Sequence, residues 1–214
     1  MSVPAPEPGP ATEPGDTPTA STADTPALRD LAGTSLAFAV VRTVPARDPE
    51  ESAALQNIAV GSLLRTIVVR RGADDYVFVL VPAGRRFDWP KLRAFLGVSR
   101  LSLPDKEEAE AVTGYERGAI TPFGATRAWP VIADATLADL GTVAIGGGAR
   151  GGNLHVPAAD LVAHLGAALV DISEPEAPAP PEPRLSCRPA AGTQGAGTGS
   201  GDATGSGGFA TGDA

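Results

Sequence analysis

The segment 35–44 alternates hydrophobic and polar residues and is rich in residues that favour strands, which predicts a half-buried strand there. Two more strands are predicted at 65–71 and 76–82, and the Gly-Ala-Asp-Asp stretch between them is typical of a hairpin turn. Further strands are expected near Ile120 and at 100–103, 130–133, 142–145, 153–156 and 168–172.

The segments between these strands carry helix signals. Asp48, Asp88 and Asp105 stand where a side chain can cap the first turn, and Gly97 and Gly114 stand where a helix commonly stops. Helices are expected at about 49–60, 89–96, 105–113 and 157–165. Strands interspersed with helices predict one α+β domain built on a mixed sheet.

The composition changes at both ends of the chain. Residues 1–26 contain seven Pro and four acidic residues but no Lys or Arg, and residues 173–214 contain six Pro and nine Gly. Such segments cannot bury enough apolar surface to offset the entropy of ordering. We therefore expect a folded domain at 27–172 between two disordered tails. The single Cys, Cys187, falls in the second tail and is expected to be incidental.

The charge is unevenly distributed. The 214 residues carry a net charge of −8, yet residues 65–100 contain eight basic and three acidic side chains. Arg70, Arg71, Arg85 and Arg86 are therefore weak candidates for contacts with RNA phosphates, and a solvated surface is the alternative. No apolar run approaches the ~20 residues of a spanning helix, and no secretory signal is visible. We expect a cytoplasmic protein without a membrane partner.

Most common site motifs are absent or in the wrong context. The segment 146–151 matches G-x-G-x-x-G, but a predicted strand follows it, whereas a dinucleotide site needs a helix there. Two His residues are too few to indicate a metal site, so no metal or cofactor is expected.

The segment 113–124, TGYERGAITPFG, is more informative. Its G-x-x-x-P run from Gly118 to Pro122 lies between a predicted helix and a predicted strand. A loop of this kind can turn backbone N–H groups toward a ligand and allow close approach. The alternative is an ordinary helix-to-strand connection.

Several segments in order resemble the YbaK/prolyl-tRNA-synthetase-associated family of aminoacyl-tRNA editing domains. They are LLRTIVVRR, YVFVLVP, FDWPKLRAFLG, TGYERGAITPFG and IGGGARG, and the resemblance covers about 35–172. It implies a single α+β domain with a mixed, partly barrel-like β-sheet surrounded by helices.

The resemblance also implies an activity. It indicates a freestanding trans-editing deacylase that hydrolyses the ester of mischarged tRNA, such as Ala or Cys on tRNA(Pro), with water and without a metal. The loop formed by Gly118, Ala119, Ile120, Thr121 and Pro122 would position the ester and stabilise its oxyanion. The implied partners are mischarged tRNA and an aminoacyl-tRNA synthetase, not DNA.

The family commonly has a Lys where this chain has Arg65, which would hold the substrate. Gly147, Gly148, Asn153 and His155 would bind the aminoacyl group. The alternatives are a tight turn between strands at the glycines and a structural His at His155. Arg keeps the charge of Lys but has a planar fork of donors, so the exchange is not neutral at a tight site. The alternative function is therefore a catalytically weakened binding protein for aminoacyl-tRNA, a nucleotide or an amino acid.

Overall fold

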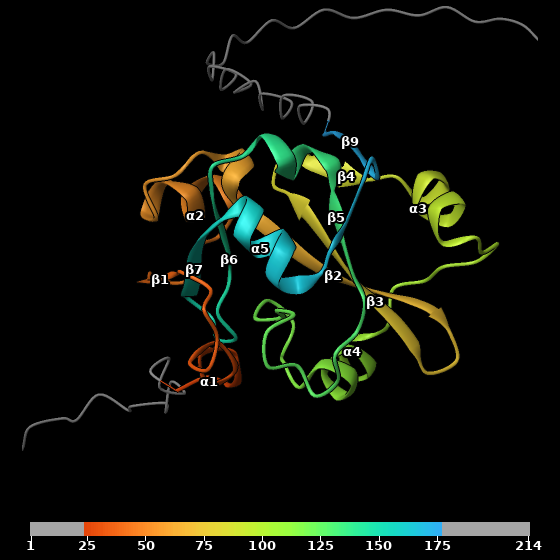
Figure 1. The fold of residues 1–214 in the computed structure, drawn as a ribbon, viewed down its shortest axis with the longest axis horizontal. Helices are drawn as coiled ribbons and strands as arrows, with labels where there is room; N and C mark the ends of the chain where they lie inside the picture. The colour runs from red at the N-terminus through yellow and green to blue at the C-terminus, as the bar shows by residue number, and fades with distance from the viewer. Residues whose placement is uncertain (1–23, 177–214) are drawn as a thin grey trace, which may run out of the picture. The chain divides into compact units, whose positions relative to one another are not determined.

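The computed structural model describes residues 24–176, and the rest of the predicted tails, with Cys187, lies outside them. Figure 1 shows the element order, which mixes helices and strands throughout. The helices are α1 (Pro26–Leu31), α2 (Pro49–Leu55), α3 (Trp89–Leu96), α4 (Lys106–Thr113) and α5 (Ala158–Leu165), with 3-10 turns at Val60–Ser62 and Ala135–Asp139. The strands are β1 (Ala39–Arg42), β2 (Leu64–Gly72), β3 (Asp75–Pro82), β4 (Arg85–Phe87), β5 (Val131–Asp134), β6 (Thr142–Gly146), β7 (Gly152–Pro157), β8 (Ala168–Val170) and β9 (Ser173–Pro175).

The strands form three sheets. The largest has the order β2-β3-β5-β8 and is mixed, because β2 and β3 form an antiparallel hairpin whereas β3-β5 and β5-β8 are parallel. A second sheet, β1-β7-β6, is antiparallel, and β4 pairs with β9. A bridge between Leu63 and Ala144 links the end of β2 to β6, but the sheets do not close into a barrel. The α+β domain with a mixed sheet is confirmed.

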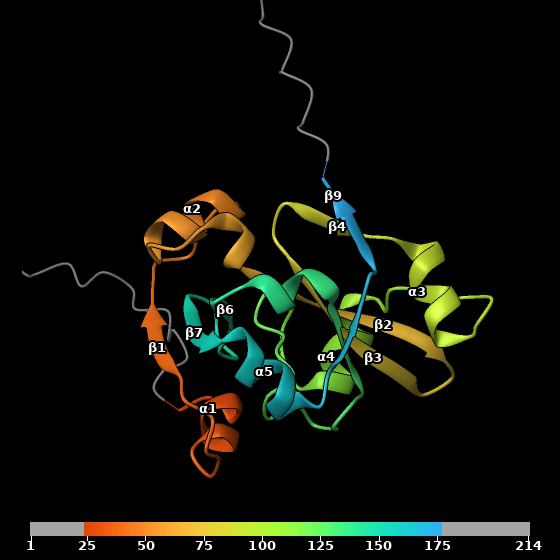
Figure 2. The ribbon, with the colours of Figure 1, turned by 45° about the horizontal axis from the view of Figure 1, so that its top comes forward.

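Strand β3 is the centre of the core. Its side chains are buried on both faces: Phe78 and Leu80 pack with Leu161 of α5, whereas Val77 and Val79 pack with Leu92 of α3. Figure 2 shows these two helices at different sides of the β2–β3 hairpin. A near-continuous apolar run is what a strand covered on both faces requires.

The capping signals are confirmed in detail. A side-chain oxygen of Asp48, Asp88 and Asp105 accepts a hydrogen bond from the third backbone N–H of α2, α3 and α4, at 2.7, 3.0 and 2.7 Å. Gly97 and Gly114 follow α3 and α4 in the left-handed conformation. These ends satisfy backbone groups that a helix otherwise leaves unpaired.

Other predicted elements differ. No strand forms near Ile120, where residues 114–130 are a loop, and segment 100–103 makes only one bridge, between Ser102 and Arg70. Helix α2 ends at Leu55 rather than near Val60, because Asn57 adopts a φ of +53° that a helix cannot continue. Helix α1 was missed, as were β4 and β9. None of the helices described is long and apolar enough to cross a bilayer.

Candidate functional site

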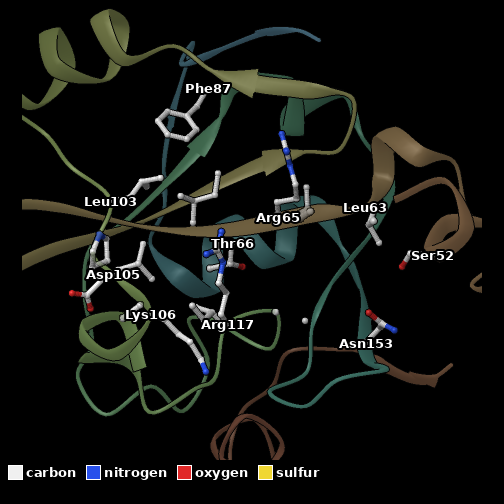
Figure 3. Close-up of a pocket in the computed structure, with 18 residues that line it drawn as sticks. Ser52, Leu63, Arg65, Thr66, Phe87, Leu103, Asp105, Lys106, Arg117 and Asn153 are labelled. Atoms are coloured by element: carbon white, nitrogen blue, oxygen red, sulfur yellow. The ribbon is translucent and has the colours of Figure 1, made fainter. Parts of the chain in front are cut away.

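A pocket of about 550 Å³ lies beside β2 (Figure 3). It is bordered by a continuous run of β2, by the beginning of α4, by the loop after α4 and by single residues of α2, β4, β6 and β7. The lining includes Ser52, residues 63–68, Phe87, residues 103–106, Ala109, Arg117, Gly118, Ile120, Gly146 and Asn153. Three segments that the sequence analysis singled out, at Arg65, Gly118 and Asn153, therefore meet at one pocket.

One wall of the pocket is the open edge of β2. This strand is the outer strand of its sheet, and its edge is bridged at Leu63 by β6 and at Arg70 by Ser102. Arg70 turns both its N–H and its C=O outward to Ser102, at 2.8 and 3.1 Å. Because backbone direction alternates along a strand, Thr66 and Val68 turn their N–H and C=O groups the same way, toward the pocket. The wall thus offers backbone donors and acceptors.

The opposite wall is the loop that contains Gly118. Ala119 N–H donates to the carbonyl of Glu116 at 3.0 Å, and Gly118 has a φ of +95°, so the turn needs Gly at this position. The Ala119 N–H is used by the turn. None of the hydrogen bonds described for residues 24–176 uses the N–H groups of Gly118 or Ile120.

Only part of the predicted loop faces the pocket. Gly118 and Ile120 line it, whereas the Ala119 side chain is 3% exposed and Thr121 is fully buried. Pro122 is half-buried and does not line the pocket. The loop therefore presents alternate residues to a ligand and packs the others inward.

Tyr115 fixes the shape of this loop. Its hydroxyl donates to the carbonyl of Phe123 at 2.7 Å, so one buried side chain ties the two ends of segment 115–123 together. Burial raises the pKa of Tyr115 to about 12, which keeps the phenol neutral and able to donate. Beyond the loop, Gly124 N–H donates to Asp30 at 2.9 Å, which attaches the loop end to α1.

Two cations that the sequence analysis did not single out line the pocket. Arg117 extends from the loop toward Thr66, and Lys106 extends from the beginning of α4 on the same side of β2 (Figure 3). The outer side of the turn is held by Arg150, which donates to Glu116 at 3.1 Å and to the Arg117 carbonyl at 3.3 Å. The position of Arg117, directly before Gly118, was the available sequence signal.

Arg65 lines the pocket but points elsewhere. Its side chain extends from the opposite side of β2 toward β4 (Figure 3), and its Nη2 donates to the carbonyl of Arg85. Its Nε is buried without a hydrogen-bond partner in the part of the chain described. The Thr66 hydroxyl, which borders the pocket, is likewise buried and unpartnered there. Unpaired buried polar groups of this kind call for a ligand or water.

The structure does not place Gly147 and Gly148 in the pocket; Gly146 lies there instead. A Cβ on Gly148 would lie 2.9 Å from Tyr115 Cε1, so the close approach of Tyr115 accounts for this Gly. The Gly147 carbonyl accepts a 2.7 Å hydrogen bond from Thr25, the residue that caps α1. The turn between β6 and β7 therefore packs against α1, a helix that the sequence analysis did not predict.

Asn153 borders the pocket and His155 does not. The two residues share a face of β7, but the Nε2 of His155 lies 3.0 Å from Oε1 of Gln56 at the end of α2. Burial lowers the pKa of His155, which favours its neutral form. Its position fits the structural role that the sequence analysis left open.

All four arginines proposed to contact RNA are paired with acidic side chains. The nitrogen–oxygen distances are 3.1 Å for Arg70–Glu108, 2.8 Å for Arg71–Asp75, 3.7 Å for Arg85–Asp134 and 3.5 Å for Arg86–Glu174. Residues 24–176 contain no group of three or more His, Cys, Asp or Glu placed to hold a metal ion.

The sequence of this α+β domain matches a known family of domains. The aminoacyl-tRNA editing domain family matches residues 43–163, more than half of the chain. The chain therefore belongs to the aminoacyl-tRNA editing domain family, as the resemblance to YbaK and its relatives implied.

Comparison with individual proteins agrees with this assignment. The proline–tRNA ligases of Thermosipho africanus and Thermosipho melanesiensis are 29% and 28% identical to this chain over 107 and 108 residues, 50% of the chain. The matched region is 19% of either ligase, so the chain matches about a fifth of these relatives.

Two solved structures are also similar. One is described as a candidate trans-editing enzyme for prolyl tRNA synthetase; it has 27% identity and a TM-score of 0.59, and the match covers 64% of this chain and 87% of that one. The other, a hypothetical protein, has 23% identity and a TM-score of 0.64, and the match covers 70% of this chain and 99% of that one. The second likeness concerns the fold alone.

Proposed function

We propose that this domain hydrolyses the ester between a small amino acid and a mischarged tRNA, with Ala or Cys on tRNA(Pro) as the first substrates to test. The family assignment and the names of the related proteins support this choice. The observation that carries it is the pocket in which the Gly118 loop faces the open edge of β2.

The chemistry needs little beyond positioning. An aminoacyl ester is activated toward water: water adds to the carbonyl carbon, negative charge develops on the carbonyl oxygen, and the ester C–O bond then breaks as the ribose oxygen takes a proton. The unused N–H groups of Gly118 and Ile120 are suitable donors to that oxygen. Loss of one such donor typically costs about 3 kcal/mol of transition-state stabilisation.

The pocket's cations suit the rest of the substrate. Lys106 and Arg117 place positive charge beside the loop, where the terminal phosphate of a tRNA 3′ end can be held. The outward backbone groups of Thr66 and Val68 and the ring of Phe87 are available to a nucleoside. This assignment needs no role for the Arg65 guanidinium in contacting the ester.

The test is deacylation of Ala-tRNA(Pro), Cys-tRNA(Pro) and correctly charged Pro-tRNA(Pro) by the full chain. We expect release of Ala or Cys and little release of Pro. A synthetase pocket discriminates one methylene by only about 1–3 kcal/mol, which is why such errors need removal. Failure to hydrolyse either ester or any other small mischarged residue would contradict the proposal.

The position of Arg65 favours a second candidate, a binding protein that retains the pocket with weakened catalysis. Its Nη2 is engaged by the Arg85 carbonyl rather than directed at the Gly118 loop. If Arg65→Lys raises deacylation strongly above that of the unmodified chain, the Arg has weakened catalysis. If Arg65→Lys leaves the rate unchanged, Arg65 is not limiting, and the hydrolase proposal stands.

A further inference from the structure

A second hollow, of about 600 Å³, lies between the end of the β2–β3 hairpin and the segment that follows α3. Four arginines line it, Arg70, Arg71, Arg93 and Arg100, and we refer to it as the arginine groove. The other lining residues are small or apolar: Gly72, Ala73, Ser99, Leu101 and Ser102.

The four arginines are not equivalent. Glu108 neutralises Arg70, and Asp75 holds Arg71 through two hydrogen bonds of 2.8 Å. Within residues 24–176, neither Arg93 nor Arg100 forms an ion pair. The groove therefore presents two guanidinium groups that form no ion pair with a carboxylate of the described residues.

The groove and the pocket lie along the same two segments. Strand β2 lines the pocket at 64–68 and the groove from Arg70 onward. The connection between α3 and α4 lines the groove at 99–102 and the pocket at 103–105. At about 3.3 Å per strand residue, Thr66 and Arg71 are about 16 Å apart along β2. A polyanion with its end in the pocket can therefore extend along β2 to the groove.

We propose that Arg93 and Arg100 bind the sugar–phosphate backbone of the tRNA acceptor end while its aminoacyl group occupies the pocket. This rests on the function proposed above. Guanidinium forks match phosphate oxygens bidentately. No aromatic side chain lines the groove, and its charged groups are guanidinium forks that face a phosphate backbone. The groove therefore supplies affinity without reading the sequence, which is the usual effect of phosphate contacts.

The test measures binding of uncharged tRNA(Pro) to the full chain by fluorescence anisotropy over a range of salt concentrations. We expect the Arg93→Ala/Arg100→Ala variant to bind about tenfold more weakly, with a salt slope smaller by about 1.5 to 2, the value for two lost phosphate contacts. Arg29→Ala is the matched control, because Arg29 is exposed on α1, pairs with Asp24 and lines neither the groove nor the pocket. It should bind like the unmodified chain.

A second substrate separates the groove from the pocket. Hydrolysis of a 3′-aminoacyl-adenosine, which lacks the acceptor stem, should proceed at an unchanged kcat/KM in the double variant. The Arg93→Lys/Arg100→Lys variant keeps the charge and should recover most of the tRNA affinity. This recovery would show that the weaker binding of the Ala variant is not due to loss of folding.

The outcomes are distinguishable. Unchanged tRNA affinity in the double variant would overturn the groove proposal even if the chain is an active deacylase, and so would an equal loss on the small substrate. Groove-dependent binding of tRNA by a chain that hydrolyses no ester would instead overturn the proposed function and leave the groove standing.

Discussion

Two glycine-containing segments meet near the pocket, and they use glycine for different reasons. In the loop after α4, Gly118 is exposed, and a Cβ there would meet nothing within 4 Å. In the turn between β6 and β7, a Cβ on Gly148 would lie 2.9 Å from Tyr115, and one on Gly151 would lie 2.3 Å from the Thr43 carbonyl. The first segment keeps space for a ligand, whereas the second allows close packing of the chain.

The largest expected effect is a loss of deacylation activity, and it separates the glycine that faces the ligand from the glycines that only shape the chain. Gly118→Ala should reduce deacylation by about a hundredfold, because strain at a φ of +95° moves the neighbouring N–H groups that face the ester. Gly97→Ala is the matched control, since Gly97 also has a positive φ and open space but ends α3 outside the pocket. Both variants should lose similar stability, about 1 kcal/mol. Equal activity in the two variants would contradict the assignment of the loop.

The second prediction concerns stability. Gly148→Ala should lower the free energy of unfolding by about 2–3 kcal/mol. The new Cβ would collide with Tyr115, and the positive φ at this position is unfavourable for Ala. Gly84→Ala, at a positive φ with no atom within 4 Å, should cost only about 1 kcal/mol. Urea unfolding of both variants measures the difference, and a smaller loss for Gly148→Ala than for Gly84→Ala would refute the packing role.

A third, smaller effect tests how the loop is held. Tyr115→Phe removes the hydrogen bond to Phe123 while keeping the buried ring, at a cost of about 1 kcal/mol. We expect kcat to fall several-fold with little change in KM, since the loop remains but its N–H groups are less well positioned. A change in KM alone would show that Tyr115 acts on binding and not on the loop.

The smallest effect is a pH dependence of stability that arises at His155. Burial lowers the pKa of His155 in the folded protein below its ordinary value of 6.5, so the unfolded chain binds the proton more readily. Stability is therefore greatest above pH 6.5 and decreases as the pH falls toward the lowered pKa. His155→Gln should flatten this part of the stability profile, and an unchanged profile would rule out His155 as its source.

Local signals were predictable from the sequence, and long-range contacts were not. The bounds of α3, 89–96, follow from Asp88 and Gly97, whose capping contacts are within the helix ends themselves. The family of the domain was also recognisable from the ordered segments. The strand expected near Ile120 was wrong, because Tyr115 and Phe123 close that segment into a loop.

The details of the site depend on parts of the chain that are distant in sequence. Arg65 is turned by a carbonyl 20 residues away, and Gly147 accepts from Thr25, 122 residues away. Lys106 and Arg117 lie beside the β2 edge because α4 and the loop after it border the same pocket. Apart from the position of Arg117 directly before Gly118, no local pattern indicates these contacts. The deacylase activity and the predicted site residues stay predictions.

The most direct test of the pocket assignment is an NMR titration of the full chain with a non-hydrolysable 3′-aminoacylamino-adenosine. The amide signals of Gly118, Ile120 and Thr66 should shift together with a single affinity, whereas those of Gly84 and Gly166, which lie outside the pocket, should not. Shifts that leave the Gly118 loop and the β2 edge unchanged, at saturating ligand, would contradict the account.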